Sequence, residues 1–257
     1  MALLAVNNLT KVFGGLSAVS DFNIELHPGE LVGLIGPNGA GKTTVFNLLT
    51  GVYEPTEGTI QFNHENIVGL KPYEITQRGM ARTFQNIRLF SNLSVLDNVR
   101  IAYHTHVKYG LTSAVMRLGN YYKEEEEMTR KAIEFLHIFN LDRKKDEIAK
   151  NLPYGEQRRL EIARALAAKP RLLLLDEPAA GMNPQETHEL MNLIKWIRDE
   201  FKLTILLIEH DMSLVMGACE RIYVLEYGMI IAHGTPEEIK SNPRVIEAYL
   251  GEEVAHA

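Results

Sequence analysis

Residues 31–51 read LVGLIGPNGAGKTTVFNLLTG, and this stretch predicts a strand, a turn and a helix in succession. The fully apolar run over 31–36 predicts a buried strand. The segment over 42–51 predicts a helix that stops at Gly51, because glycine is favoured just after a helix end. The side chains expected to point inward from this helix are all apolar: Val45, Phe46, Leu48 and Leu49.

The turn over residues 36–43, GPNGAGKT, fits the pattern G-x-x-x-x-G-K-[ST]. A place between a predicted strand and a predicted helix supports a phosphate-binding loop. The glycines let backbone N–H groups turn inward as a nest for an anion. We expect Lys42 to supply a point charge to the outer phosphates and Thr43 a hydroxyl to Mg²⁺. The alternative is a glycine-rich turn with an incidental lysine.

A second apolar run, LLLLDEP over 172–178, ends in two carboxylates. Asp176 is expected at the carboxyl end of a central strand, where ligands of α/β proteins lie. It would hold Mg²⁺ directly or through water, and Glu177 would polarise an attacking water. An acidic pair after an apolar run is commonplace by itself. It becomes specific here because a phosphate-binding loop precedes it.

Residues 152–166, LPYGEQRRLEIARAL, predict a turn that leads into a helix. The first turn of a helix leaves N–H groups unpaired and carries partial positive charge, so this helix mouth suits an anion. We expect Arg158, Arg159 and Glu161 to face solvent. Helical spacing puts the apolar side chains on the buried side: Leu160, Ala163 and Ala167, flanked by Ile162 and Leu166.

The composition of the 257-residue chain, 46% hydrophobic and 23% charged, is ordinary for a globular protein. Its net charge of -6 argues against a broad basic surface for nucleic acid. The single cysteine, Cys219, excludes an internal disulfide and is expected to be buried. The N-terminal MALLAVNNLTK is no signal peptide, and no apolar run reaches the roughly 18 residues of a membrane span. A cytosolic protein is therefore expected.

Apolar strands alternate with helices along the chain, which predicts an α/β fold with a parallel core sheet. Residues 3–30 indicate antiparallel strands. Residues 95–150 look mainly helical, with EEEE over 124–127 as a solvated helix face. The other expected elements are a helix over 152–168, a strand over 171–176, a helix over 184–201, a strand over 203–210 and a hairpin over 223–234 turning at Tyr227-Gly228.

In this order, and over nearly the whole length, these motifs resemble the ATP-binding subunit of an ATP-binding-cassette (ABC) transporter. The resemblance implies a P-loop ABC ATPase with a central, mostly parallel sheet, an antiparallel β subdomain and an inserted helical subdomain. It implies one ABC ATP-binding domain over 1–257, with a catalytic core at about 1–86 and 167–257 and a helical subdomain at about 87–166. It also implies ATP and Mg²⁺ as cofactors, and ATP hydrolysis coupled to transport.

The resemblance assigns roles to residues that are unremarkable alone. Phe13 matches the aromatic that stacks on adenine, with a core aromatic as the alternative. Gln85 in RTFQN matches the glutamine that reaches Mg²⁺ and faces the membrane partner, and His210 in LLIEHD matches the switch histidine on the γ-phosphate. Glu177 and His210 are then the implied catalytic residues, and Thr43, Gln85 and Asp176 the implied metal ligands. The implied nucleotide-binding residues are Phe13, Val19, Gly36, Pro37, Asn38, Gly39, Ala40, Gly41, Lys42, Thr43, Thr44 and Gly155.

The helix mouth at 152–157 corresponds to the family's signature motif, usually LSGGQ, which closes over the γ-phosphate bound by the other subunit. Here Pro153 replaces the serine and removes both a hydroxyl and an N–H. Tyr154 replaces the first glycine and Glu156 the glutamine. Further on, Asn183 stands where many members carry aspartate. Contact with the γ-phosphate through the Gly155 N–H and the helix dipole is therefore expected to be weaker.

LPYGEQRRLEIARAL, DEPAAGMNP, LLIEHDM and SNPRVIEAYLGEE closely resemble subunits of branched-chain amino-acid importers. That resemblance implies two membrane permease subunits, a second ATP-binding subunit, distinct or identical, and indirectly an extracytoplasmic substrate-binding protein. It places the chain peripherally on the cytoplasmic face of the inner (plasma) membrane, with no nucleic-acid partner. The segment over 104–122 either touches a membrane subunit or packs on the helical lobe. A metal site at His104 and His106 is set aside, since no carboxylate or cysteine partner is evident.

Several functions compete with this interpretation. Lipopolysaccharide-export and urea-import ABC ATPases look similar overall and stay open as alternatives. A DNA-repair ABC ATPase would carry long coiled coils between Gln85 and Leu152, and a ribosome-associated one would carry two cassettes. A small-molecule kinase built on the phosphate-binding loop would leave the signature helix without a purpose.

Overall fold

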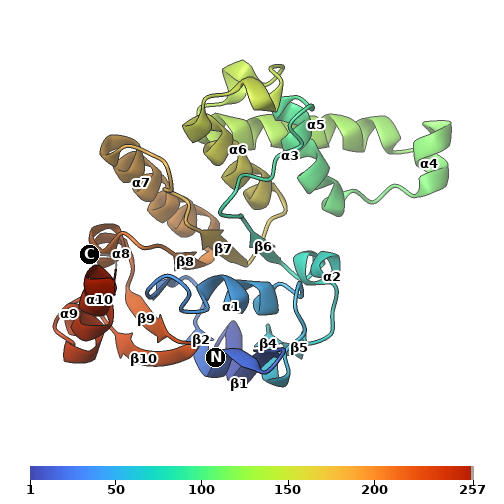
Figure 1. Cartoon of the computed structure of the whole chain (residues 1–257). Coiled ribbons are helices and arrows are strands. Elements are labelled where there is room, and N and C mark those ends of the chain that lie inside the picture. Colours follow the sequence, from blue (N-terminus) through green and yellow to red (C-terminus); the bar gives the residue numbers. More distant parts are fainter. Residues whose placement is uncertain (256–257) are drawn as a thin grey trace. The chain divides into compact units, whose positions relative to one another are not determined.

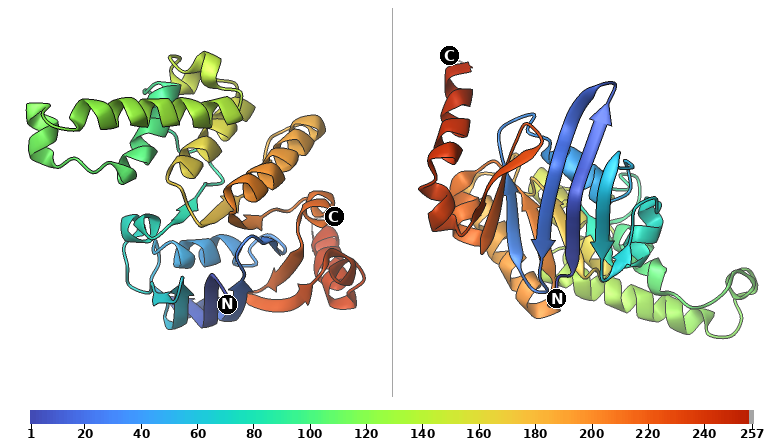
Figure 2. Two further views of the ribbon diagram at one scale, coloured as in Figure 1. Left: turned by 180° about the vertical axis from the view of Figure 1, so that it is seen from behind. Right: turned by 90° about the horizontal axis from the view of Figure 1, so that it is seen from below.

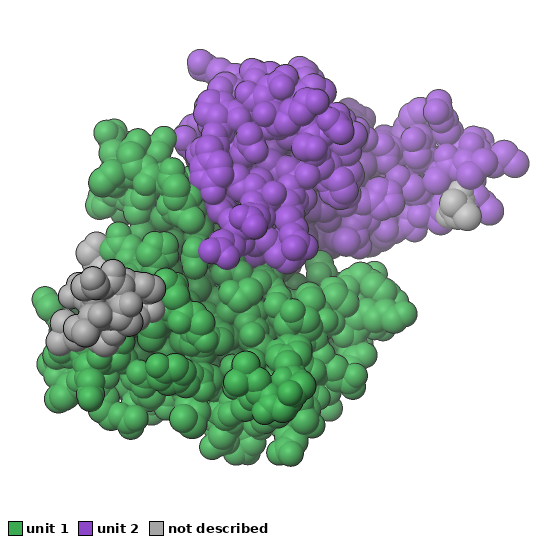
Figure 3. All heavy atoms as spheres, viewed as in Figure 1, with its two compact units in different colours: residues 1–82, 171–257 green, residues 83–170 purple. Residues whose placement is uncertain are grey.

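The computed structural model describes residues 1–255 of the chain, except for the side chains of Leu111, Ser213 and residues 250–255. It divides into two compact units, coloured separately in Figure 3. Unit 1 comprises Met1–Arg82 and Arg171–Ala257, and unit 2 comprises Thr83–Pro170. In the described residues, no helix is long and apolar enough to cross a membrane.

Unit 1 contains a six-stranded sheet in the order β10-β9-β3-β8-β7-β6. Its strands pair in parallel except for β10, which runs antiparallel to β9. Every residue of β3, β7 and β8 is buried, as expected for strands covered on both faces. The expected parallel core sheet is confirmed. The strands are β3 Leu31–Ile35, β6 Met80–Arg82, β7 Leu172–Asp176, β8 Thr204–Ile208, β9 Arg221–Glu226 and β10 Met229–Gly234.

A second sheet of unit 1 is antiparallel, with the order β2-β1-β4-β5. Burial alternates along the second half of β2, so one face of the sheet packs on the core and the other is exposed. The strands run side by side in the right-hand view of Figure 2. The predicted antiparallel subdomain is confirmed. Its strands are β1 Leu4–Phe13, β2 Leu16–Leu26, β4 Glu57–Phe62 and β5 Glu65–Asn66.

Helix α1, Lys42–Leu49, lies between the two sheets of unit 1 (Figure 1). Its four predicted inward side chains are all buried in a cluster that also contains residues of both sheets. Burying each such side chain contributes about 1.5–3 kcal/mol to stability. Because the cluster contains residues of both sheets, helix α1 joins them into one core. The helix ends as expected, because Gly51 follows it with φ +69°.

Helix α7, Pro184–Phe201, has the bounds expected from the sequence. Asn183 caps it: its side chain accepts the Glu186 N–H at 2.9 Å, and the Glu186 carboxylate accepts the Asn183 N–H at 3.0 Å. The other helices of unit 1 are α2 Pro72–Gln77, α8 Met212–Ala218, α9 Pro236–Lys240 and α10 Pro243–Ala255.

Cys219, just after helix α8, is buried as predicted. Burial raises the pKa of its thiol to about 12, so the thiol stays protonated.

The β9–β10 hairpin turns at Tyr227 and Gly228, as predicted, and both residues have positive φ (45° and 80°). Its tip contacts the loop over 36–43, since the Gly228 N–H donates to the Ala40 carbonyl at 2.8 Å. The Gly228 carbonyl accepts the Ser20 N–H at 2.9 Å. The hairpin therefore braces the predicted phosphate-binding loop against β2.

Unit 2 is helical, as expected for residues 95–150. Its core joins α3 and α6 to α5 through side chains with almost no exposed surface, among them Val99, Leu136 and Leu160. The α-helices are α3 Val95–Tyr103, α4 Leu111–Met116, α5 Tyr121–Ile138 and α6 Tyr154–Ala167. Short 3-10 turns link them: η1 His104–His106, η2 Asp142–Lys144 and η3 Ala149–Asn151.

The solvent-exposed position expected for Arg158 and Glu161 is wrong. Both side chains are completely buried and form an ion pair of 2.9 Å. Arg158 also donates to the carbonyls of Phe84 and Gln85, at 2.6 Å each, and Glu161 accepts the Arg88 N–H at 3.1 Å. These hydrogen bonds offset much of the cost of burying the two charges, although the Arg158 Nε is buried without a partner. We call this group the buried clamp, because it fastens the loop over 84–88 to helix α6.

The acidic run over 124–127 is not simply a solvated face. Glu124 accepts the Lys108 N–H at 2.7 Å, and Glu125 forms an ion pair of 2.7 Å with Arg100. The Tyr109 hydroxyl donates to Glu125, which raises the pKa of Tyr109 to about 12. Two of the four glutamates thus hold the segment that precedes α5.

The segment over 104–122 is part of unit 2; its aromatic residues contact one another, and His106 contacts the residue that follows helix α6. The rings of Tyr109 and Tyr121 lie 5.1 Å apart, and His106 Nε2 lies 2.9 Å from the Ala168 carbonyl. Among the described residues, no group of three or more His, Cys, Asp or Glu side chains could hold a metal. The tip of the segment stays exposed: Val115, Met116, Leu118 and Tyr122.

Candidate functional site

The loop over 36–43 depends on glycine at two places. Gly36 has φ +152°, and a Cβ there would collide with the Leu225 carbonyl. Gly41 has φ +106°, and a Cβ would lie 2.6 Å from the Ala18 carbonyl. The backbone therefore turns tightly between β3 and α1. The first N–H groups of α1 point toward the inside of this turn. A strand-to-helix turn of this form can cradle an anion.

Lys42 lies at the start of α1 with only 8% of its surface exposed. Its ammonium group donates to the carbonyls of Gly36 at 2.6 Å and Pro37 at 2.9 Å. The charge is thus held over the loop. Around it, Asn38, Gly39 and Thr43 are exposed, Pro37 and Thr44 are half-buried, and Ala40 is buried.

Asp176 ends strand β7 and is only 2% exposed. Arg82 at the end of β6 donates to its carboxylate at 2.7 Å, and also to the Asn47 side chain at 2.7 Å. Sequence reasoning missed Arg82. A lone arginine in RTFQN carries no periodic signal, and its partner lies 94 positions away. The Arg82 guanidinium thus fixes the position of the Asp176 carboxylate through an ion pair in which both side chains are almost completely buried.

The two predicted catalytic residues, Glu177 and His210, are close together. Glu177 follows β7 with φ +45°, and its N–H donates to the Ile208 carbonyl of β8 at 2.9 Å. His210 follows β8, and its Nδ1 lies 3.9 Å from Glu177 Oε2. A Glu with positive φ is uncommon, and such strain collects at functional positions.

Glu209 is a third acidic residue at this place, and the sequence analysis did not single it out. It is 1% exposed and accepts the Ala179 N–H at 3.0 Å. Burial raises its pKa, and the Glu177 charge raises it further. Its Oε2 also lies 3.9 Å from His210 Nδ1. Glu209 thus anchors the chain that follows β7 and β8.

Phe13 and Val19 differ in what they can offer a ligand. Phe13 is 42% exposed, so it is not a core aromatic; Lys11 Nζ lies 5.0 Å from its ring, and the Tyr53 ring lies 5.2 Å away at a steep angle. Val19 has no exposed surface and packs in the core of unit 1. A direct ligand contact by the Val19 side chain does not fit this burial.

Gln85 and Gly155 belong to unit 2. Gln85 is exposed, and its carbonyl is held by Arg158 in the buried clamp. Gly155 is the second residue of α6, and Pro153 occupies the N-cap position without a side-chain hydrogen bond. The N-terminus of α6 therefore presents the backbone N–H groups of its first turn together with the Tyr154 and Glu156 side chains.

These residues fit a nucleotide with Mg²⁺. The loop supplies N–H donors and a lysine for phosphates. Asp176 and Thr43 supply the oxygen ligands that Mg²⁺ prefers, and in phosphate sites this ion uses only one or two carboxylates and takes its remaining ligands from phosphate and water. Asp176 and Thr43 therefore suit a Mg²⁺ ion that binds together with the nucleotide phosphates.

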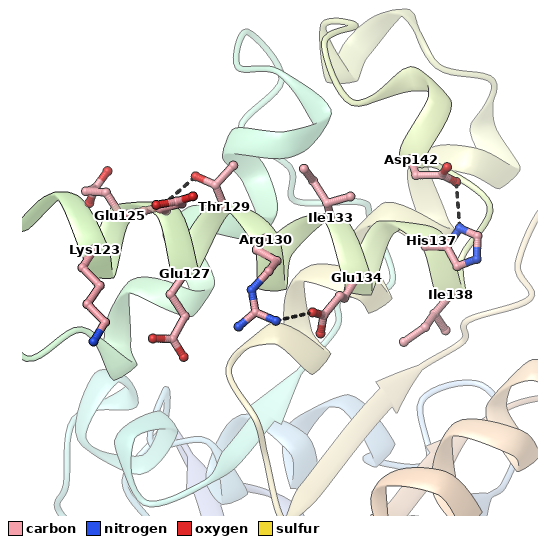
Figure 4. A pocket seen from close by; sticks show the side chains of 11 residues that line it. Lys123, Glu125, Glu127, Thr129, Arg130, Ile133, Glu134, His137, Ile138 and Asp142 are labelled. Carbon is pink, nitrogen blue, oxygen red and sulfur yellow. Dashed lines mark hydrogen bonds and ion pairs between the residues drawn. The ribbon is translucent and has the colours of Figure 1, made fainter.

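A surface hollow of about 1110 Å³ along helix α5 is unrelated to these residues. Figure 4 shows its lining, in which Arg130 pairs with Glu134 at 3.1 Å and His137 lies 3.6 Å from Asp142. None of the predicted site residues lines it.

Comparison with known proteins gave concordant matches. A family model described as ABC transporter matches residues 19–180, and one described as branched-chain amino acid ATP-binding cassette transporter matches 229–255. The chain is 51% identical to the high-affinity branched-chain amino acid transport ATP-binding protein LivG of Escherichia coli (strain K12), over 97% of this chain and 98% of that protein. It is 47% identical to BraF of Pseudomonas aeruginosa, which has the same description, with the same coverage.

Two further matches extend the comparison. The crystal structure of an ATP-binding cassette of an ABC transporter in its ADP conformation superposes with a TM-score of 0.85 at 32% identity, covering 98% of this chain and 99% of that one. The lipopolysaccharide export system ATP-binding protein LptB of Escherichia coli (strain K12) is 36% identical over 98% of this chain and 99% of that protein.

Proposed function

This chain belongs to the ABC transporter family, and from that premise we propose that it binds and hydrolyses ATP to power the import of branched-chain amino acids. The observation that carries the proposal is the 51% identity to LivG over 97% of the chain, which spans both the loop over 36–43 and the strand-end carboxylates. The 36% identity to LptB makes lipopolysaccharide export the weaker candidate.

Each residue of the predicted nucleotide site receives a proposed role. The loop N–H groups and Lys42 bind the β- and γ-phosphates, and Phe13 stacks on the adenine ring. Mg²⁺, held by Asp176 and Thr43 with Gln85 reaching it, would neutralise phosphate charge. Glu177 accepts a proton from the water that attacks the γ-phosphorus, and the bond to ADP breaks.

His210 and the mouth of α6 would complete the reaction. His210 contacts the γ-phosphate and is positioned by Glu177 and Glu209. Gly155 acts on the γ-phosphate bound by a second ATP-binding subunit, distinct or identical. Val19 supports the loop from the core of unit 1. Its side chain is buried, so we propose no direct contact between this side chain and the nucleotide.

The proposed assembly adds two permease subunits and, indirectly, an extracytoplasmic binding protein. The chain would lie peripherally on the cytoplasmic face of the membrane. The proposed organisation is one ABC ATP-binding domain over 1–257, with a catalytic core at about 1–86 and 167–257 and a helical subdomain at about 87–166. Closure of two such subunits on ATP and their release after hydrolysis would drive the permeases.

Lys42→Ala should weaken ATP binding by about 10- to 150-fold, since a hydrogen bond to a charged group is worth roughly 1.5–3 kcal/mol. Titration calorimetry with ATP measures the dissociation constant. Lys240→Ala, an exposed lysine in α9, is the control and should bind like wild type. Unchanged affinity in Lys42→Ala would remove the lysine from the phosphate site.

Arg88→Glu should reduce transport while leaving ATP binding near normal. Arg88 is exposed, stacks 4.3 Å from the Phe84 ring and adjoins the exposed Phe90, so the surface over 86–100 presents cationic and aromatic groups to a permease helix. Arg143→Glu, another exposed arginine of unit 2, is the matched control. Cysteines placed over 86–100 can test contact directly, because the only native thiol is buried. Failure of every such cysteine to crosslink to a permease would refute this docking surface.

A further inference from the structure

The negative charge at the mouth of α6 is paired. Glu156 is the third residue of the helix and the acidic residue of its first turn. Lys144, at the end of η2, donates to both oxygens of its carboxylate, at 2.8 and 2.7 Å. The two side chains are 36% and 22% exposed, so the pair lies at the surface of unit 2.

An unpaired Glu156 would oppose anion binding at this mouth. A helix N-terminus carries about half a positive charge, whereas a carboxylate carries a full negative one. Pro153 contributes no N–H, and Arg158 is committed to the carbonyls of Phe84 and Gln85 in the buried clamp. Among the described residues, the cation that contacts the Glu156 carboxylate is Lys144.

We propose that Lys144 is a positioning residue that makes this altered signature motif attractive to the γ-phosphate of the opposing ATP. It does so by neutralising Glu156 and drawing the carboxylate onto η2. This inference rests on the proposed function, because it needs a second nucleotide-bound subunit. An ion pair this exposed contributes little to folding, so its effect belongs to phosphate binding rather than to stability.

The test uses the complete transporter, purified with its permeases and partner ATPase. Lys144→Met should raise the KM for ATP, and the orthovanadate concentration for half-inhibition, by about 3- to 30-fold at about 50 mM NaCl. The increase should shrink at about 500 mM NaCl, which a purely structural defect would not do. Lys144→Arg, and Lys145→Met as a matched neighbour, should stay close to wild type.

The decisive variant is Lys144→Met combined with Glu156→Gln. Removal of both charges should restore the KM and the vanadate sensitivity to near wild-type values. A double variant as impaired as Lys144→Met, or a Lys144→Met enzyme identical to Lys145→Met, would overturn the proposal. A wild-type complex that does not hydrolyse ATP would instead refute the proposed function, and this inference with it.

Discussion

Glu177→Gln should slow ATP hydrolysis by about 10²- to 10⁴-fold while ATP still binds. The amide can hydrogen-bond the attacking water but cannot accept its proton. Glu177 is suited to the task, because its backbone is fixed to β8 and its carboxylate faces His210 at 3.9 Å. Single-turnover release of phosphate, with a separate binding titration, measures both quantities.

Two further variants test whether Glu177, rather than another glutamate, is the general base. Glu200→Gln, an exposed residue of α7, should hydrolyse ATP at the wild-type rate. Glu209→Gln removes the neighbouring buried carboxyl, whose raised pKa reflects burial, and we expect a smaller loss than for Glu177→Gln. If Glu209→Gln abolishes hydrolysis while Glu177→Gln does not, the general base is Glu209.

Arg158→Met should destabilise unit 2 by about 3–5 kcal/mol, because Glu161 would remain buried without its cation. The carbonyls of Phe84 and Gln85 would also lose their donors. For a chain of this size the melting temperature should fall on the order of 10 °C. Differential scanning calorimetry measures the change, and the neighbouring Arg159→Met should alter it little.

A double variant separates the charge from the packing in the buried clamp. Arg158→Met with Glu161→Leu removes both ions, so its loss of stability should be clearly smaller than the sum of the two single losses. Additive losses would mean that the two side chains stabilise unit 2 independently.

Periodicity and motif order predicted most of the fold. Fully apolar runs gave buried parallel strands β3, β7 and β8, and the helix over 184–201 was correct at both ends. These features follow from local spacing, which a single sequence carries. The phosphate-binding loop is local as well, and its glycines have the positive φ values that the turn needs.

The buried charges could not be predicted in this way. Arg158 and Glu161 lie on a helix as a polar pair, and nothing local distinguishes them from a solvated one. Their partners, the backbone groups of Phe84, Gln85 and Arg88, are more than 70 residues away. The same holds for Arg82, whose partner Asp176 is on another strand. Long-range contacts of this kind are visible only in the folded chain.

Uptake into proteoliposomes tests the central claim most directly. Vesicles would contain this chain, its permeases and its partner ATPase, with the binding protein and labelled leucine supplied on the substrate side and ATP on the side of the ATPases. We predict ATP-dependent leucine accumulation that isoleucine and valine compete away and that Glu177→Gln abolishes. Vesicles that hydrolyse ATP but accumulate no branched-chain amino acid above the Glu177→Gln level would contradict the account.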